Sequence, residues 1–365
     1  MNEPVNPQPE DPDHAMAGSA AEATAGLATP TENRPETAPE TAVEAAPESA
    51  PVAASGLQSS VRGVPLPERT KAPANASDYL PLLQNQYGNE NAGANVLPSA
   101  FQFLNNSMGG WRPGLHLIAG EPGSGKSSFA LFNAAMAAQE GFSALYLSFD
   151  VRAEFLVLKL LCQQASLNSR DVMDGNIPPD TLNAAMTAQE ETFSRIKIVE
   201  ANPELSNESA MEMARQLIAD SERDRILVII DYLQIWAAGS RQFTEFRHEI
   251  AKLMTTMRRL ALDLDSPVLA ISSQNRQHQG EALLQSLEGT SDLEYSADSI
   301  TFLVNVERPA SQGSYTHPDD LISKSRSVSI NLRKNRFGEI GSRMVKFFPA
   351  TGAFDEETVR RPYGR

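Results

Sequence analysis

The sequence predicts an α/β protein in which helices cover both faces of a doubly wound, mostly parallel sheet, preceded by a disordered tail. Three observations support this fold class. From about residue 96 onward, short apolar runs alternate with stretches of helical periodicity, which is typical of a parallel sheet built through crossover helices. One of these runs ends in a glycine-rich turn that leads into a helical pattern. The first 60 residues contain no aromatic residue.

The individual elements follow from these patterns. Apolar runs rich in branched residues predict buried parallel strands, because a strand covered on both faces lacks polar alternation. They span residues 115–120, 143–149, 196–200, 226–231 and 267–273. Further strands are predicted at 299–306, 327–334 and 343–348. The clearest helical pattern spans 243–264, where Met254 and Met257 are expected to fill the core. We therefore expect one domain over residues 96–355.

The regions outside this domain differ in composition. Residues 1–60 hold ten acidic residues and one basic residue, a net charge of -9, and such a segment is expected to be disordered. It is either a solubilising spacer or a docking arm for a partner protein. Residues 61–95 are predicted to be a linker with a docking helix, capped by Ser77 and with Pro81 in its first turn. Residues 356–365 are predicted to be a flexible C-terminus.

Composition limits the classes of function. The formal net charge of -15 argues against nucleic-acid binding by bulk charge, although a local basic channel remains compatible with it. The single cysteine, Cys162, excludes a disulfide framework and a cysteine-based zinc site. No apolar run is long enough to span a membrane, and the acidic, proline-rich start does not resemble a signal peptide. We therefore expect a cytoplasmic protein without a membrane segment.

The strongest signal is a phosphate-binding loop. Residues 120–127 read GEPGSGKS and match G-x-x-x-x-G-K-[ST] between a predicted strand and a predicted helix. Glycines allow the backbone N–H groups to point at phosphate oxygens, and the helix N-terminus adds positive charge. Lys126 is expected to reach the β- and γ-phosphates. The residues expected to bind ATP are Gly120, Glu121, Pro122, Gly123, Ser124, Gly125, Lys126, Ser127 and Ser128.

Three more side chains follow neighbouring strands at the edge where a parallel sheet binds its ligand. Asp231 ends the run ILVIID and is expected to bind Mg²⁺ together with Ser127. Asp150 is the candidate for orienting the attacking water, with Glu154 as the second choice, and Gln274 is the candidate for contacting the γ-phosphate. For the two aspartates, the alternative is a structural cap at the end of a strand.

Several segments together resemble the ATPase domain of DnaB-type replicative helicases, within the RecA-like superfamily of phosphate-loop NTPases. The resemblance covers residues 96–350. It is carried by GGWRPGLHLIAGEPGSGKSS (109–128), LYLSFDVRAEFLVLKLL (145–161), DYLQIW (231–236), SPVLAISSQNR (266–276), EYSADSITFLV (294–304) and RKNRFGEIG (333–341). KNRFG is also similar to the RadA branch, whose four-cysteine zinc element this chain lacks.

The resemblance implies a ring, a hexamer, that binds ATP between subunits and single-stranded DNA in its channel. It implies that Lys334 and Arg336 act in trans on the neighbouring subunit's γ-phosphate; the alternative is a solvated strand end. The chain departs from the family pattern in three residues: Asp150 replaces a glutamate, Ser127 a threonine and Glu288 a DNA-contacting arginine. Thr290 and Ser291 remain as candidates for DNA contact.

From the sequence we expect an ATP-hydrolysing, helicase-type motor that acts on single-stranded DNA in replication or repair. The alternative is a RecA-like regulatory or scaffold ATPase that forms rings but does not unwind DNA. Glu288, Asp150 and the acidic tail favour this alternative.

Overall fold

The computed structural model describes residues 75–88, 96–238, 246–275, 280–287, 291–306 and 325–356. The predictions for the tail 1–60, for Glu288 and Thr290, and for residues 357–365 lie outside these ranges. Each predicted strand is present, and one short strand was missed. The strands are β1 (Gly114–Gly120), β2 (Ser143–Ser148), β3 (Ile196–Glu200), β4 (Ile226–Asp231), β5 (Pro267–Ser273), β6 (Ser299–Val306), β7 (Arg326–Asn335), β8 (Gly341–Phe348) and β9 (Ala353–Asp355).

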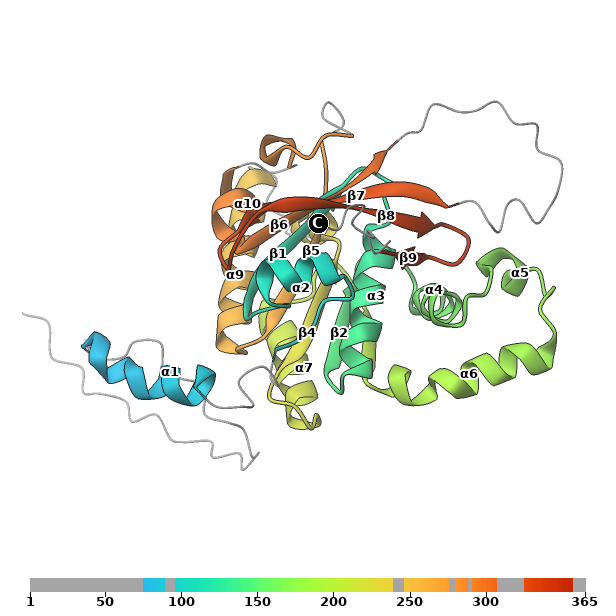
Figure 1. Ribbon diagram of the computed structural model, residues 1–365, viewed down its shortest axis with the longest axis horizontal. Helices are drawn as coiled ribbons and strands as arrows, with labels where there is room; N and C mark the ends of the chain where they lie inside the picture. The colour runs from blue at the N-terminus through green and yellow to red at the C-terminus, as the bar shows by residue number, and fades with distance from the viewer. Residues whose placement is uncertain are drawn as a thin grey trace, which may run out of the picture. The chain divides into compact units, whose positions relative to one another are not determined.

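These strands form one sheet in the order β3-β2-β4-β5-β1-β6-β7-β8-β9 (Figure 1). The pairings from β3 through β6 are parallel, and those from β6 through β9 are antiparallel. The predicted mostly parallel sheet is therefore confirmed. The prediction that residues 196–200 form a fully buried strand is wrong, since β3 is the edge strand and its residues are exposed or half-buried.

The helices cover both faces of the sheet, as predicted. Within β4, Leu227 and Ile229 pack in the core cluster that contains residues of α3, whereas Val228 and Ile230 pack in the cluster that contains residues of α7 and α9. This alternation is the two-residue period of a strand. The helices on the two faces are α2 (Gln102–Met108), α3 (Lys126–Gln139) and α4 (Ala153–Ala165) on the first, and α7 (Asn207–Ala219), α8 (Leu233–Ala238) and α9 (Phe246–Asp263) on the second.

The remaining helices are shorter or less buried. They are η1 (Ala76–Tyr79), α1 (Leu80–Tyr87), α5 (Ser169–Met173), α6 (Pro179–Ser194), η3 (Leu284–Ser286) and α10 (Ser291–Ser296). Pro81 lies in the first turn of α1, as predicted. Ser77 is not its cap, because it lies inside η1, where the Asp78 carboxylate accepts a hydrogen bond from the Asn75 backbone N–H (2.9 Å).

Helix α3, which begins at the phosphate loop, is anchored through Asn133. The Asn133 Oδ1 atom accepts hydrogen bonds from the Ala100 backbone N–H (3.0 Å) and the Trp111 indole N–H (2.8 Å). Both the amide and the indole side chains are buried, so these bonds hold the chain that enters β1 against α3. Glu356 accepts hydrogen bonds from the backbone N–H groups of Gln102 (2.6 Å) and Phe103 (2.9 Å). The contacts of the core thus extend one residue beyond the predicted boundary at 355.

Among the described residues, no helix is both long enough and apolar enough to span a membrane.

Candidate functional site

The phosphate loop connects β1 to α3 at the carboxyl edge of the parallel strands. Gly123 (φ +79°) and Gly125 (φ +95°) adopt left-handed conformations, which side chains strongly disfavour. A Cβ on Gly120 would lie 2.5 Å from the Leu303 carbonyl oxygen, so this position admits only glycine. The predicted glycine requirement therefore has a physical cause at these three positions.

Lys126 is folded over the loop. Its Nζ donates hydrogen bonds to the carbonyl oxygens of Gly120 and Glu121, both at 2.9 Å. Burial lowers the pKa of Lys126, and the negative charges of Asp231 and Glu121 oppose this shift. A lysine ammonium at the mouth of a phosphate loop can bind phosphate oxygens as a point charge.

Asp231 is buried at the end of β4 and is held by two hydroxyl groups. The Tyr146 hydroxyl donates to Asp231 Oδ2 at 2.6 Å. Burial raises the pKa of Asp231, whereas hydrogen bonds from Tyr146 and Ser127 and the charge of Lys126 lower it. The structure thus brings together Lys126, Ser127 and Asp231. Sequence reasoning missed Tyr146, whose place inside a predicted buried strand indicated only a core residue.

The residues of this site fit the predicted nucleotide and metal. Ser124 Oγ is buried and has no hydrogen-bond partner among the described residues, which suits an oxygen-rich ligand at the loop. Ser127 and Asp231 offer side-chain oxygens that could bind a metal. The described residues contain no cluster of three or more His, Cys, Asp or Glu that could hold a metal. Such a sparse oxygen set suits Mg²⁺, which keeps several waters and binds substrate phosphates.

Two further contacts shape the loop. Asn305 Nδ2 donates to Glu121 Oε1 at 2.5 Å. The Arg326 guanidinium donates to the Gly123 carbonyl oxygen and lies over the Phe347 ring, 4.9 Å from its centroid. Burial lowers the pKa of Arg326, and Glu121 opposes the shift. Arg326 is a cation of the loop's own subunit that the sequence had not singled out.

Asp150 and Gln274 lie at the same edge of the sheet. The Phe149 backbone N–H donates to the Asp231 carbonyl oxygen (2.7 Å), and the next residue, Asp150, is exposed. Gln274 follows β5, whose Ser273 is registered with Gly120, and its Nε2 donates to the Glu281 carbonyl oxygen (2.5 Å) and to Ser286 Oγ (2.8 Å). Glu154 instead forms an exposed ion pair with Arg152 (2.5 Å). The catalytic roles of these residues stay predictions.

Lys334 and Arg336 lie far from the phosphate loop of their own chain. The Asp298 carbonyl oxygen accepts a hydrogen bond from the Arg336 backbone N–H (2.9 Å), and Asp298 N–H donates to the Leu115 carbonyl oxygen (2.7 Å). Arg336 is therefore level with Leu115, five residues before Gly120. That separation is about 16 Å along β1, with β6 lying between β1 and β7.

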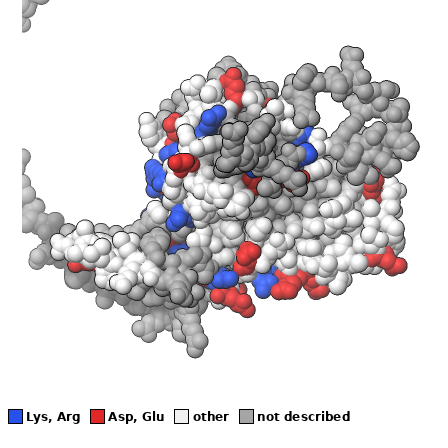
Figure 2. All heavy atoms as spheres, viewed as in Figure 1, with Lys and Arg blue, Asp and Glu red and all other residues white. Residues whose placement is uncertain are grey.

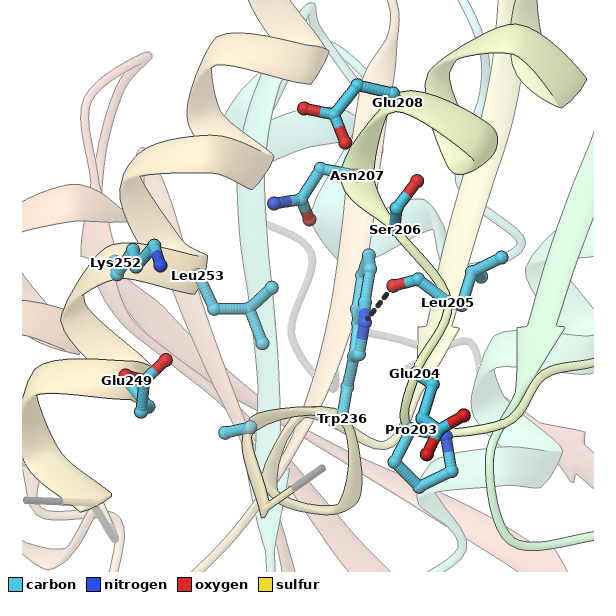
Figure 3. A pocket seen from close by; sticks show the side chains of 11 residues that line it. Pro203, Glu204, Leu205, Ser206, Asn207, Glu208, Trp236, Glu249, Lys252 and Leu253 are labelled. Atoms are coloured by element: carbon cyan, nitrogen blue, oxygen red, sulfur yellow. Dashed lines mark hydrogen bonds between the residues drawn. The ribbon is translucent and has the colours of Figure 1, made fainter. Parts of the chain in front are cut away.

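A separate cavity of about 400 Å³ lies between the start of α7, α8 and the start of α9 (Figure 3). It is lined by Pro203, Glu204, Leu205, Ser206, Asn207, Glu208, Trp236, Ala237, Glu249, Lys252 and Leu253. The Trp236 indole N–H donates to the Leu205 carbonyl oxygen (2.9 Å), and its ring stacks on Phe149 (5.0 Å between centroids). The cavity contains no residue of the phosphate loop, but its lining residue Trp236 stacks on Phe149, the residue that precedes Asp150.

Comparisons with known proteins give a family match over most of the chain. Residues 96–356 match the family model described as DnaB-like helicase C terminal domain. The chain is 23% identical over 287 residues to the replicative DNA helicase DnaB of Geobacillus stearothermophilus, covering 76% of this chain and 59% of that protein. It is 24% identical over 257 residues to the replicative DNA helicase DnaC of Bacillus subtilis, covering 69% and 54%. The chain thus spans little more than half the length of these relatives.

Among solved structures, an isolated ATPase domain is similar with a TM-score of 0.65 and 21% identity, over 78% of this chain and 99% of that chain. A DnaB-like replicative helicase, solved in a study of its interactions with primase, gives a TM-score of 0.63 and 21% identity, over 78% and 67%. These likenesses confirm the predicted fold, a RecA-like sheet with helices on both faces.

Proposed function

The chain belongs to the DnaB-like helicase C-terminal domain family, and on that premise we propose that it is an ATP-hydrolysing motor that acts on single-stranded DNA as a ring. The observation that carries the proposal is the separation between its two sets of phosphate-binding candidates. One set lies at the carboxyl edge of the parallel strands and consists of Lys126, Ser127 and Asp231. The other set, Lys334 and Arg336, lies toward the amino edge of these strands.

This separation favours a site completed by two subunits. Arg336 is about 16 Å along β1 from Gly120, with β6 between β1 and β7, which is farther than its side chain can reach. If Arg336 serves a nucleotide, that nucleotide belongs to a second copy of the chain. A contact between the carboxyl edge of one copy and the amino edge of the next copy is heterologous, because it joins two different surfaces. A heterologous assembly that closes is a ring. A hexamer is the size that the family resemblance implies.

The reaction is attack of water on the γ-phosphate of ATP. Lys126 and the loop N–H groups bind the phosphates, and Asp150 accepts a hydrogen bond from the water and orients it. Ser127 and Asp231 would hold Mg²⁺, which would supply positive charge beside the phosphate oxygens. Lys334 and Arg336 of the neighbouring subunit stabilise the negative charge that develops on the transferred group.

The polynucleotide is proposed to bind weakly. The chain carries a net charge of -15, and Glu288 replaces the arginine that the family resemblance leads us to expect. On the face shown in Figure 2, the acidic and basic side chains of the described residues are interspersed and form no continuous basic stripe. Binding must then depend on few phosphate contacts, among which Thr290 and Ser291 are candidates. Salt must weaken it with a shallow slope, because the slope scales with the number of contacts. The acidic tail 1–60 is a candidate for recruiting a partner protein.

The named relatives are replicative helicases, which supports the motor over the regulatory ATPase. The test is an ATPase assay with and without single-stranded DNA, run beside a mass measurement of the assembly, with Lys126→Ala as the inactive control. We expect a ring-sized mass and DNA-stimulated hydrolysis that Lys126→Ala abolishes. If the protein hydrolyses ATP but does not bind single-stranded DNA even at low salt, the motor is refuted and the regulatory ATPase takes its place.

A further inference from the structure

Asp298 is a buried acid that the proposed site does not use. It lies between α10 and β6, and its side chain is 6% exposed. Its Oδ1 accepts hydrogen bonds from the guanidinium groups of Arg258 (2.9 Å) and Arg336 (3.0 Å). Its Oδ2 accepts one from the Leu115 backbone N–H (2.9 Å). One carboxylate thus joins a helix, a strand end and the start of β1.

The surrounding contacts leave little freedom for this carboxylate. A Cβ on Gly114 would lie 2.6 Å from Asp298 Oδ2, so the carboxylate sits directly against the backbone that begins β1. A buried ionised carboxylate requires paired charges and filled hydrogen-bonding positions. Arg258, Arg336 and the N–H of Leu115 provide these, which makes Asp298 the centre of a fixed arrangement.

The end of α10 supplies a second anchor for the same cations. The carbonyl oxygens of the last residues of a helix have no partner within the helix. Arg336 donates to the Tyr295 carbonyl oxygen (3.0 Å) and Arg258 to that of Ser296 (2.6 Å). Lys334 donates to the carbonyl oxygens of Glu294 and Tyr295. Lys334 is therefore held by backbone oxygens, whereas Arg336 is also held by a carboxylate.

We infer that Asp298 is a positioning residue that orients Arg336 toward the nucleotide of the neighbouring subunit. The inference rests on the proposed function, in which Arg336 acts in trans. The Arg336 side chain is 43% exposed, so a second subunit can contact it. The Asp298 carbonyl oxygen accepts from its backbone N–H and the Asp298 carboxylate from its guanidinium, which fixes the base and the direction of the side chain. Through Leu115, the same carboxylate ties Arg336 to the strand whose other end carries the subunit's own phosphate loop.

The substitution Asp298→Asn tests this role. It removes the charge that offsets two guanidinium groups. The asparagine also has only one acceptor oxygen, so its NH2 group must face either the Leu115 N–H or the arginines, which are donors themselves. Arg336 is then free to leave its orientation, and a misplacement of about 1 Å can lower kcat about 10²-fold. The KM for ATP should change little, because Lys126 and the loop are untouched and the cation acts on charge that develops in the transition state.

The decisive comparison is the double variant. Arg336→Ala alone should lower kcat by about 10³-fold or more. If Asp298 acts through Arg336, then Asp298→Asn combined with Arg336→Ala should be no slower than Arg336→Ala alone. Independent effects would multiply, and a double variant that is about 10²-fold slower than Arg336→Ala overturns the inference. The matched control is Asp265→Asn, which breaks another aspartate–arginine pair, with Arg225 (2.5 Å), and should leave kcat unchanged.

Each variant is first checked for its melting temperature, its ring mass and its binding of a non-hydrolysable ATP analogue. If Asp298→Asn does not fold, Asp298→Glu, which keeps the charge but displaces it by one methylene, takes its place in the same comparison. The two proposals fail separately. If Arg336→Ala keeps its kcat, the trans role of the proposed function is wrong. If Arg336→Ala is slow but the folded Asp298 variant has an unchanged kcat, only the positioning role is overturned.

Discussion

The separation between Lys126 and Arg336 leads to a quantitative prediction for mixed rings. Lys126→Ala and Arg336→Ala are each expected to be inactive when assembled alone, since the first lacks the loop ammonium and the second lacks the trans cation. In a mixed ring, an interface is intact when two conditions hold. The nucleotide must be bound by an Arg336→Ala subunit, which keeps Lys126, and the neighbour that supplies the trans cation must be a Lys126→Ala subunit, which keeps Arg336.

The size of the recovery follows from counting interfaces. With equal amounts of the two variants assembled at random, each of the two conditions holds at about half of the positions, so about a quarter of the interfaces are intact. If the sites act independently, the ATPase rate per subunit should recover to about a quarter of that of the unmodified protein. Homogeneous Arg336→Ala rings should remain about 10³-fold below the unmodified protein, so the signal is large.

The assay is steady-state ATP hydrolysis by rings whose mixed composition is verified by native mass spectrometry. The control is a mixture of Lys126→Ala with Asp231→Asn. Both of these side chains lie at the loop edge of the sheet, where the charge of Lys126 lowers the pKa of Asp231. Both therefore serve the nucleotide of their own subunit, so every site in that mixture lacks one of them and no recovery is expected. A rate that stays at background in verified Lys126→Ala and Arg336→Ala rings would refute the reasoning and make Arg336 a cis or structural residue.

Three other predictions concern the attacking water, the binding of single-stranded DNA and the anchor of α3. Asp150→Asn should strongly reduce ATP hydrolysis whereas Asp150→Glu should hold or raise it; an Asn variant with normal kcat would move the role elsewhere. Glu288→Arg, and separately deletion of residues 1–60, should tighten binding to single-stranded DNA in titrations against salt, with Glu288→Arg steepening the slope by about 0.7 per added contact; unchanged affinity in both would contradict this. Asn133→Leu should lower the free energy of unfolding in urea by about 2–5 kcal/mol, because it leaves the buried Trp111 indole and a backbone N–H unpaired; a loss below about 0.5 kcal/mol would be inconsistent with the anchor.

Some features of this protein are determined locally, and these could be predicted from the sequence. The phosphate loop is one, because left-handed backbone at Gly123 and Gly125 and the helix start at Lys126 are properties of a short segment. The strands are another, since a run such as ILVIID must be covered on both faces wherever it lies in the sheet. The helix predicted over 243–264 is present in the described residues as Phe246–Asp263, and its C-terminal end lies one residue before the predicted one, because helix termini are the least constrained part of a periodic pattern.

Other features depend on which distant segments become neighbours, and only the tertiary structure decided them. Residues 196–200 have the composition of an inner strand, but strand order places them at the edge. Tyr146 contacts Asp231 because β2 pairs with β4 across 85 residues of sequence. Asp298 and Arg336 are joined because β6 and β7 pair antiparallel with Ser299 opposite Asn335, which brings the next residue on each side together. Composition and periodicity determine how a segment folds, whereas strand order and register, set by the packing of the whole core, determine which side chains meet.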